Sequence, residues 1–243
     1  MGRFTTIDPL AEKYYSVSPY AYCGNNFVNR IDPTGMIWED QKEADVLKTS
    51  IQETEDGLDK DKLQTKLDNK DNPLSDKQRG ETEAKKADID AMKSSLEISK
   101  GNIDALKADN NHTYDLVNAD GEMHNVIQGT DGIIKIEGSN DALYIHEIDH
   151  VAKSLRSNNG LQFSDEGLLM PSLSPSSGRN DEIAAYRAQY AFSPWSLPSK
   201  AGSINDINLE WVATLRNSSG QVAYPAINQI WVNYQISLRK AGR

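Results

Sequence analysis

The chain has 243 residues, of which 36 are acidic and 26 are basic, so its formal net charge is -10. An acidic chain is a poor candidate for a nucleic-acid binder, because binding to phosphates needs clustered Lys and Arg. The single cysteine, Cys23, excludes an intramolecular disulfide and a zinc site built from cysteine thiolates. No apolar run approaches the length that crosses a membrane, so we expect no stable membrane insertion.

Composition divides the chain into three expected segments, namely residues 1–38, 39–110 and 111–243. The first segment is rich in Tyr, Asn and Pro and carries no long charge run. The second contains 19 acidic and 13 basic residues, about half of all charges in the chain. The third has the mixed composition of an ordinary globular domain, with most of the Trp, Ile and Val.

The charged segment predicts a helical hairpin. Its apolar residues recur at spacings of three and four, which is typical of one helix face. Asn72-Pro73 interrupts that pattern, and Ser75 then begins a capping-box sequence for a second helix. Gly80 and Gly101 weaken the expectation of continuous helices. We interpret the hairpin as a solvated spacer, with a partly disordered linker as the alternative.

The third segment predicts an α+β fold. Three short β-prone runs, separated by turn residues, lie at residues 114–117, 125–128 and 133–137. A helix is expected over residues 142–155, where apolar residues follow the helical period. Further helices are expected over residues 181–192, 206–215 and 226–238.

A metal-binding pattern lies on the helix expected at 142–155. His146 and His150 are four residues apart, which places both imidazoles on one face of a helix. Glu147 lies beside the first imidazole and has the chemistry of a general base that takes a proton from a zinc-activated water. Asp149 is expected to face solvent or to hydrogen-bond a ligand imidazole. The alternative is a helix that displays two surface histidines.

A third ligand is needed, and Glu182 is the preferred candidate. It lies 32 residues after His150 in a helix whose alanines permit close packing. Asp181 and Glu166 are rival ligands. The alternative role of Glu182 is that of an acidic residue at a helix N-terminus, favoured by the helix dipole.

The arrangement His146-Glu147-x-x-His150 with a downstream glutamate resembles the gluzincin group of zinc metallopeptidases. The resemblance covers about residues 133–192 and rests on short motifs. It implies that the strand at 133–137 binds peptide backbone by strand addition. It also implies that Tyr186, one turn beyond the third ligand, stabilises the oxyanion, although packing in the core explains that tyrosine equally well.

Residues 3–36 resemble the end of an RHS-repeat-associated core domain. The residues that carry this resemblance are Asp8-Pro9-Leu10, Ser18-Pro19-Tyr20-Ala21-Tyr22, Gly24-Asn25-Asn26 and Asp32-Pro33-Thr34-Gly35-Met36. In that family the core encloses a variable C-terminal toxin, and two aspartates act in self-cleavage. The resemblance implies that Asp8 and Asp32 are this pair, with cleavage near Met36-Ile37. Simple turns at the two Asp-Pro pairs are the alternative.

Together these features predict a zinc metallopeptidase that hydrolyses peptide bonds as the toxin of an RHS-type protein. We expect a zincin-like domain with a small β-sheet and a metal-binding helix after the hairpin. A protein or peptide in a target cell would be the substrate, and a cognate immunity protein a partner. The N-terminus lacks a signal-peptide pattern, so we expect delivery from the cytoplasm without a cleaved signal. The alternative function is a non-enzymatic interaction or adhesion fragment with an inactive metal site.

Overall fold

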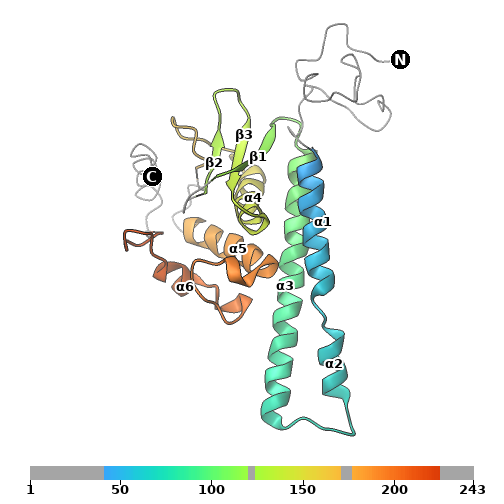
Figure 1. The fold of residues 1–243 in the computed structure, drawn as a ribbon. Coiled ribbons are helices and arrows are strands. Elements are labelled where there is room, and N and C mark those ends of the chain that lie inside the picture. Colours follow the sequence, from blue (N-terminus) through green and yellow to red (C-terminus); the bar gives the residue numbers. More distant parts are fainter. Residues whose placement is uncertain (1–40, 120–123, 171–176, 225–243) are drawn as a thin grey trace, which may run out of the picture.

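The computed structural model describes residues 41–119, 124–170 and 177–224. These residues form an α+β fold in which helices surround one small sheet, as the sequence predicts. A long helical hairpin lies along one side of the body and extends beyond it (Figure 1). The expected self-cleavage pair, Asp8 and Asp32, and the helix expected over 226–238 lie outside the described residues.

The charged segment folds as the predicted hairpin. Its helices are α1 (Gln41–Gly57), α2 (Asp61–Asp68) and α3 (Asp76–Ala108). The side chain of Ser75 accepts a hydrogen bond from the backbone N–H of Gln78, and the side-chain oxygen of Gln78 accepts one from the backbone N–H of Ser75. These two bonds form the predicted capping box. Helix α3 continues through Gly80 and Gly101, because the stabilising contacts along its length outweigh the low helix propensity of two glycines.

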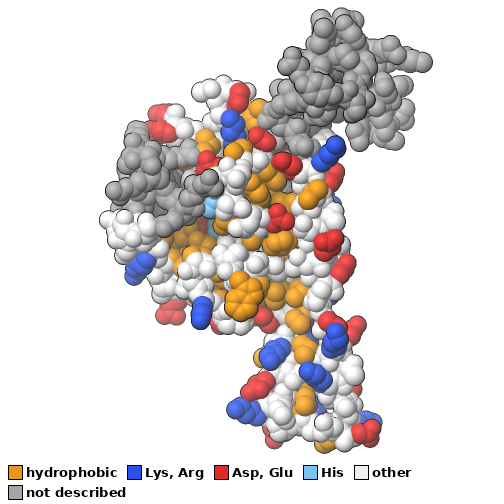
Figure 2. Space-filling view, viewed as in Figure 1, with side chains coloured by type: hydrophobic (Ala, Val, Ile, Leu, Met, Phe, Trp, Pro, Cys, Tyr) orange, Lys and Arg blue, Asp and Glu red, His pale blue; other side chains and the backbone are white. Residues whose placement is uncertain are grey.

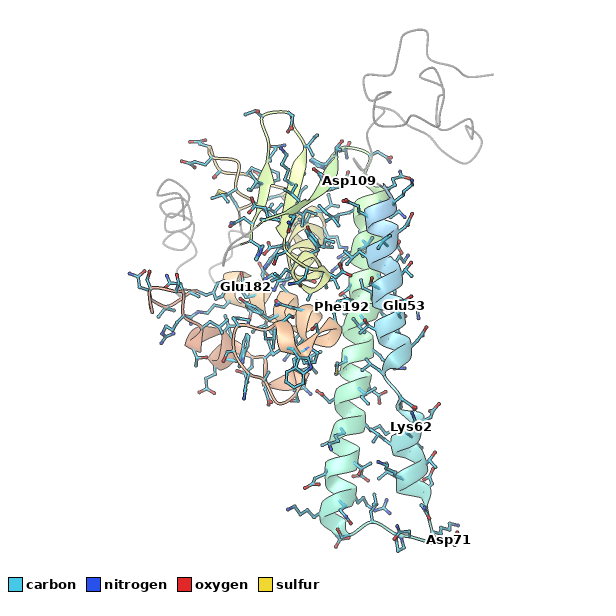
Figure 3. All side chains as sticks on the ribbon, in the orientation of Figure 1. Glu53, Lys62, Asp71, Asp109, Glu182 and Phe192 are labelled. Carbon is cyan, nitrogen blue, oxygen red and sulfur yellow. The ribbon has the colours of Figure 1, made fainter. Side chains whose placement is uncertain are left out.

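Charged side chains cover the far end of the hairpin. Asp71 lies at its tip (Figure 3), and Figure 2 shows side chains of both charge signs interspersed over this region. Helix α2 contains no buried residue, so little apolar burial supports it. Nearer the body, Lys100 bridges Glu55 of α1 at 2.6 Å, with both side chains largely shielded from solvent. None of the described helices is long and apolar enough to span a membrane.

The sheet consists of β1 (Tyr114–Asn118), β2 (Val126–Gln128) and β3 (Ile134–Gly138), in the order β1-β3-β2. Strand β3 lies in the centre, parallel to β1 and antiparallel to β2. The prediction that residues 133–137 bind peptide by strand addition is therefore wrong, because neighbouring strands already pair with both edges of β3.

The loop after the helix that carries His146 and His150 folds back onto β2. Leu168 forms an antiparallel bridge with Ile127, and the N–H of Gln128 donates to the carbonyl of Gly167 at 2.7 Å. Gly167 has a φ of +80° and lies so close to this strand that an added Cβ would approach the Gln128 carbonyl oxygen to 2.5 Å. Only glycine fits this position, and the loop thereby covers the outer edge of β2.

Three further helices follow the sheet, namely α4 (Asp141–Leu155), α5 (Ser177–Phe192) and α6 (Leu209–Thr214). Asn140 caps α4 by accepting the N–H of Leu143. Helix α5 begins four residues earlier than the predicted start at residue 181. Its first turn is held by Arg179, whose guanidinium donates two hydrogen bonds to the carbonyl of Tyr224, a tertiary contact that local sequence does not reveal.

One hydrophobic core connects the hairpin to the rest of the molecule. Leu96 and Ile103 of α3 are fully or almost fully buried in the same cluster as Ile134 of β3 and Ile148 of α4. Burial of this kind supplies most of the free energy that stabilises a helix in a folded protein. The body-proximal part of the hairpin is therefore structurally integral to the fold.

Replacing Leu96 with alanine should lower the free energy of unfolding by about 2–5 kcal/mol, because it leaves a cavity at a fully buried site. Chemical denaturation measures this difference. Ile98 provides the matched control two residues away, since 60% of its surface is exposed. Ile98→Ala should change stability by less than about 1 kcal/mol, and equal losses in the two variants would contradict the shared core.

Candidate metal centre

His146 and His150 of α4 face Glu182 of α5. Figure 3 labels Glu182 on α5. His146 is 5% exposed and Glu182 is 6% exposed. A carboxylate is rarely buried this deeply unless a partner compensates its charge. Glu182 is the sixth residue of α5 and faces the two imidazoles. Its position is therefore explained by this contact better than by the dipole of the helix N-terminus.

The three side chains converge through their metal-binding atoms. The Nε2 atoms of His146 and His150 are 3.2 Å apart. One carboxylate oxygen of Glu182 lies 3.4 Å from Nε2 of His146, and the other lies 3.5 Å from Nε2 of His150. Among the described residues, these three form the one group of His, Cys, Asp and Glu side chains that can hold a metal ion.

These separations fit a zinc ion. Zinc binds histidine nitrogen and carboxylate oxygen at about 2.0–2.1 Å in a tetrahedron, whose edges are then roughly 3.3 Å long. The 3.2 Å between the two Nε2 atoms matches that edge, and each carboxylate oxygen of Glu182 lies at a similar distance from one of the two nitrogens. In addition, Oε2 of Glu182 is buried and has no hydrogen-bond partner among the described residues. Such an oxygen is costly to bury unless a cation compensates it.

Gln189 fixes the protonation of His146. The Gln189 amide nitrogen donates to the carbonyl of Ser196 at 2.8 Å, so its carbonyl oxygen faces Nδ1 of His146 at 3.0 Å. Because that oxygen can only accept, Nδ1 carries the proton and Nε2 keeps its lone pair for a metal. Gln189 is 1% exposed and was not predicted from the sequence. It lies seven residues after Glu182, on the same helix face, which is the signal that identifies it.

The charges of the three groups are coupled. Burial is the largest single influence and disfavours the charged form of both His150 and Glu182. The charge attraction and hydrogen bonding among the site's side chains together outweigh it, so the pKa of His150 is raised and that of Glu182 is lowered. Burial lowers the pKa of His146, and the nearby His150 lowers it further, although Glu182 opposes this. His146 is therefore the neutral imidazole, in agreement with its hydrogen bond to Gln189.

Glu147 lies between the two histidines in sequence and is half-buried. Burial raises the pKa of its carboxyl group to about 8, with His150 opposing the shift and Glu182 and Glu137 adding to it. Its carboxyl group therefore shares the electrostatic environment of His150 and Glu182. A cation in this environment would favour the ionised form, which is the form that can accept a proton.

Two tyrosines lie beside the histidines. The ring of Tyr186 contacts the His146 ring edge-on, with centroids 4.5 Å apart, and its hydroxyl lies 2.7 Å from that of Tyr224. The predicted residue, Tyr186, is thus next to the metal centre and also packs against Trp211. Tyr224 was not predicted, because it reaches the site from 38 residues further along the chain.

The rival ligands lie outside this group. Asp181 forms an ion pair of 2.6 Å with Lys153 of α4, and Glu166 is exposed in the loop that covers β2. Asp149 neither faces solvent nor bonds a ligand imidazole, which differs from both expectations. It is 7% exposed and accepts a hydrogen bond from Asn102 of α3, because the side of α4 that carries it packs on the hairpin.

Comparison with protein-family models, with curated proteins and with solved structures gives no match to this chain. The resemblances to gluzincins and to RHS core domains stay predictions from the sequence.

Replacing Gln189 with leucine should weaken zinc binding about 10–100-fold, because His146 loses the acceptor that sets its tautomer. Competition with a chromophoric chelator measures the affinity. Gln189→Glu is the matched control, since it keeps an acceptor for the Nδ1 proton and should retain more of the affinity. An unchanged affinity in Gln189→Leu would show that this hydrogen bond does not tune the site.

Proposed function

We propose that this chain is a zinc-dependent endopeptidase that acts as the C-terminal toxin of an RHS-type polymorphic toxin. The observation that carries the enzymatic part is the convergence of the Nε2 atoms of His146 and His150 and the carboxylate of Glu182. The toxin part rests on the resemblance of residues 3–36 to the end of an RHS core domain.

In this proposal His146, His150 and Glu182 hold the zinc ion through Nε2, Nε2 and a carboxylate oxygen. A zinc ion with three protein ligands supplies Lewis acidity, which polarises the scissile carbonyl group and lowers the pKa of water. Gln189 maintains the tautomer of His146. His146 and Glu182 are buried and His150 is partly exposed, and this environment strengthens the electrostatic interactions among the three side chains.

Glu147 is the proposed general base. It takes a proton from the attacking water and delivers it to the nitrogen of the leaving amine, so that the C–N bond breaks as a new C–O bond forms. Its raised pKa in the metal-free protein follows from burial beside Glu182 and Glu137. A positive charge at the histidines reverses that effect and makes the carboxylate available.

Tyr186 and Tyr224 are proposed to act together on the carbonyl oxygen of the substrate. A buried tyrosine hydroxyl needs a hydrogen-bond partner, and each of these hydroxyls serves the other at 2.7 Å. Donation from Tyr186 to Tyr224 polarises the second hydroxyl and makes it a stronger donor to a developing oxyanion. The hydroxyl of Tyr224, which is less deeply buried than Tyr186, is the better placed of the two to meet a substrate.

The substrate is proposed to be a protein or peptide of a target cell, with a cognate immunity protein protecting the producer. Delivery into the target cell is proposed because residues 3–36 resemble the end of an RHS core domain. Asp8 and Asp32 remain the proposed self-cleavage pair. These proposals concern the biological setting and are independent of the chemistry at the metal centre.

Glu147→Gln should leave zinc bound at one ion per chain and lower hydrolysis of a fluorescently labelled, unfolded casein substrate by at least about 100-fold. The reason is that glutamine preserves the size of the side chain but accepts no proton. Zinc content by elemental analysis and product release by fluorescence are measured on the same preparation.

The matched control is Glu166→Gln, which changes the same functional group on the exposed loop and should keep wild-type activity. Full activity in Glu147→Gln would contradict its role as the base. Zinc binding without hydrolysis in the wild type and in both variants would favour an interaction protein with an inactive metal site.

A further inference from the structure

A buried polar network joins the metal-binding helix to the hairpin. The amide of Asn102 on α3 donates to Oδ1 of Asp149 on α4 at 3.0 Å. The carbonyl oxygen of the same amide accepts from Arg156 at 2.6 Å, and Arg156 also donates to the carbonyl of Gly101. Asn102 is 2% exposed and Asp149 is 7% exposed, so this pair lies inside the molecule, whereas Arg156 reaches it from the surface.

Burial of the Asp149 carboxylate costs free energy in this position. Its second oxygen, Oδ2, is buried and has no hydrogen-bond partner among the described residues. The nearby cation, Arg156, contacts Asn102 and does not form an ion pair with Asp149 in the described structure. A buried carboxylate held by one neutral donor destabilises a fold unless another positive charge compensates it.

The metal centre is the place where that positive charge would lie. Asp149 precedes His150 directly and lies about one helical turn beyond His146. Because Asp149 is buried this close to both imidazoles, its negative charge favours a cation at their position. The network with Asn102 orients the carboxylate from the opposite side of α4, where the hairpin packs.

We propose that Asp149, oriented by Asn102 of the hairpin, is a positioning residue that strengthens cation binding at the metal centre without being a ligand. This inference rests on the metal-binding part of the proposed function. In this proposal α3 helps to orient a residue next to the metal centre. The body-proximal half of the hairpin is then part of the site's support and not only a spacer. Loss of an outer group that supports a metal ligand typically costs about 10–100-fold in metal affinity, and Asp149 acts here through its charge and not through a hydrogen bond to a ligand.

Asp149→Asn tests the proposal, because asparagine keeps an oxygen that accepts from Asn102 but removes the charge. The dissociation constant for zinc, measured by chelator competition, should rise about 10–100-fold. The melting temperature of the metal-free protein should stay equal or rise, because an uncompensated buried charge is gone. A residue with a merely structural role would instead raise the dissociation constant and lower the melting temperature of the metal-free protein.

Two further variants complete the test. Asn102→Ala should also weaken zinc binding, and its effect should be smaller when Asp149 is already asparagine. Asp104→Asn removes a charge from an exposed position on α3 and should leave the zinc affinity unchanged. An unchanged affinity in Asp149→Asn, or a loss matched by a lower melting temperature of the metal-free protein, overturns the proposal. If the wild type binds no zinc, the metal centre itself is contradicted, and not only the role of Asp149.

Discussion

The packing of α5 against α4 is the contact on which the site depends. It buries Glu182 against two imidazoles in an interior where three polar groups are otherwise costly. Close approach is possible because α5 carries small residues on the buried face, including Ala185 and Ala188. A cation between the two helices would turn an unfavourable cluster into a stabilising cross-link, which couples metal binding to stability.

Elements far apart in the sequence hold this contact from several sides. Asn102 of the hairpin donates a hydrogen bond to Asp149 of α4, and the carbonyl of Ser196, which follows α5, accepts a hydrogen bond from Gln189. The segment after α6 returns to the site and places Tyr224 on Tyr186. Asn102, Ser196 and Tyr224 each fix the orientation of one side chain that lies nearer the site. A precise ligand geometry requires such support.

Sequence patterns predicted the parts of this site that repeat with the helical period. Two histidines four residues apart identify their own helix, and Glu182 follows from the need for a third ligand on a neighbouring helix. Gln189 lies on the face already marked by Glu182 and was predictable in principle. Asn102 and Tyr224 were not, because they approach from 47 and 38 residues away through tertiary packing. The central position of β3 in the sheet was also not predictable, because it depends on the order of the strands. The alternation of buried and exposed residues along a single strand does not specify that order.

The central claim is that one metal ion is held between α4 and α5, and it is tested most directly by zinc content in a cross-helix variant. Elemental analysis should find about one zinc per chain in the wild type and much less in Glu182→Gln, which retains the shape of the side chain. Asp181→Asn, the neighbouring acid that pairs with Lys153, should keep the full zinc content. Zinc retained in Glu182→Gln, or absent from the reconstituted wild type, would contradict the account.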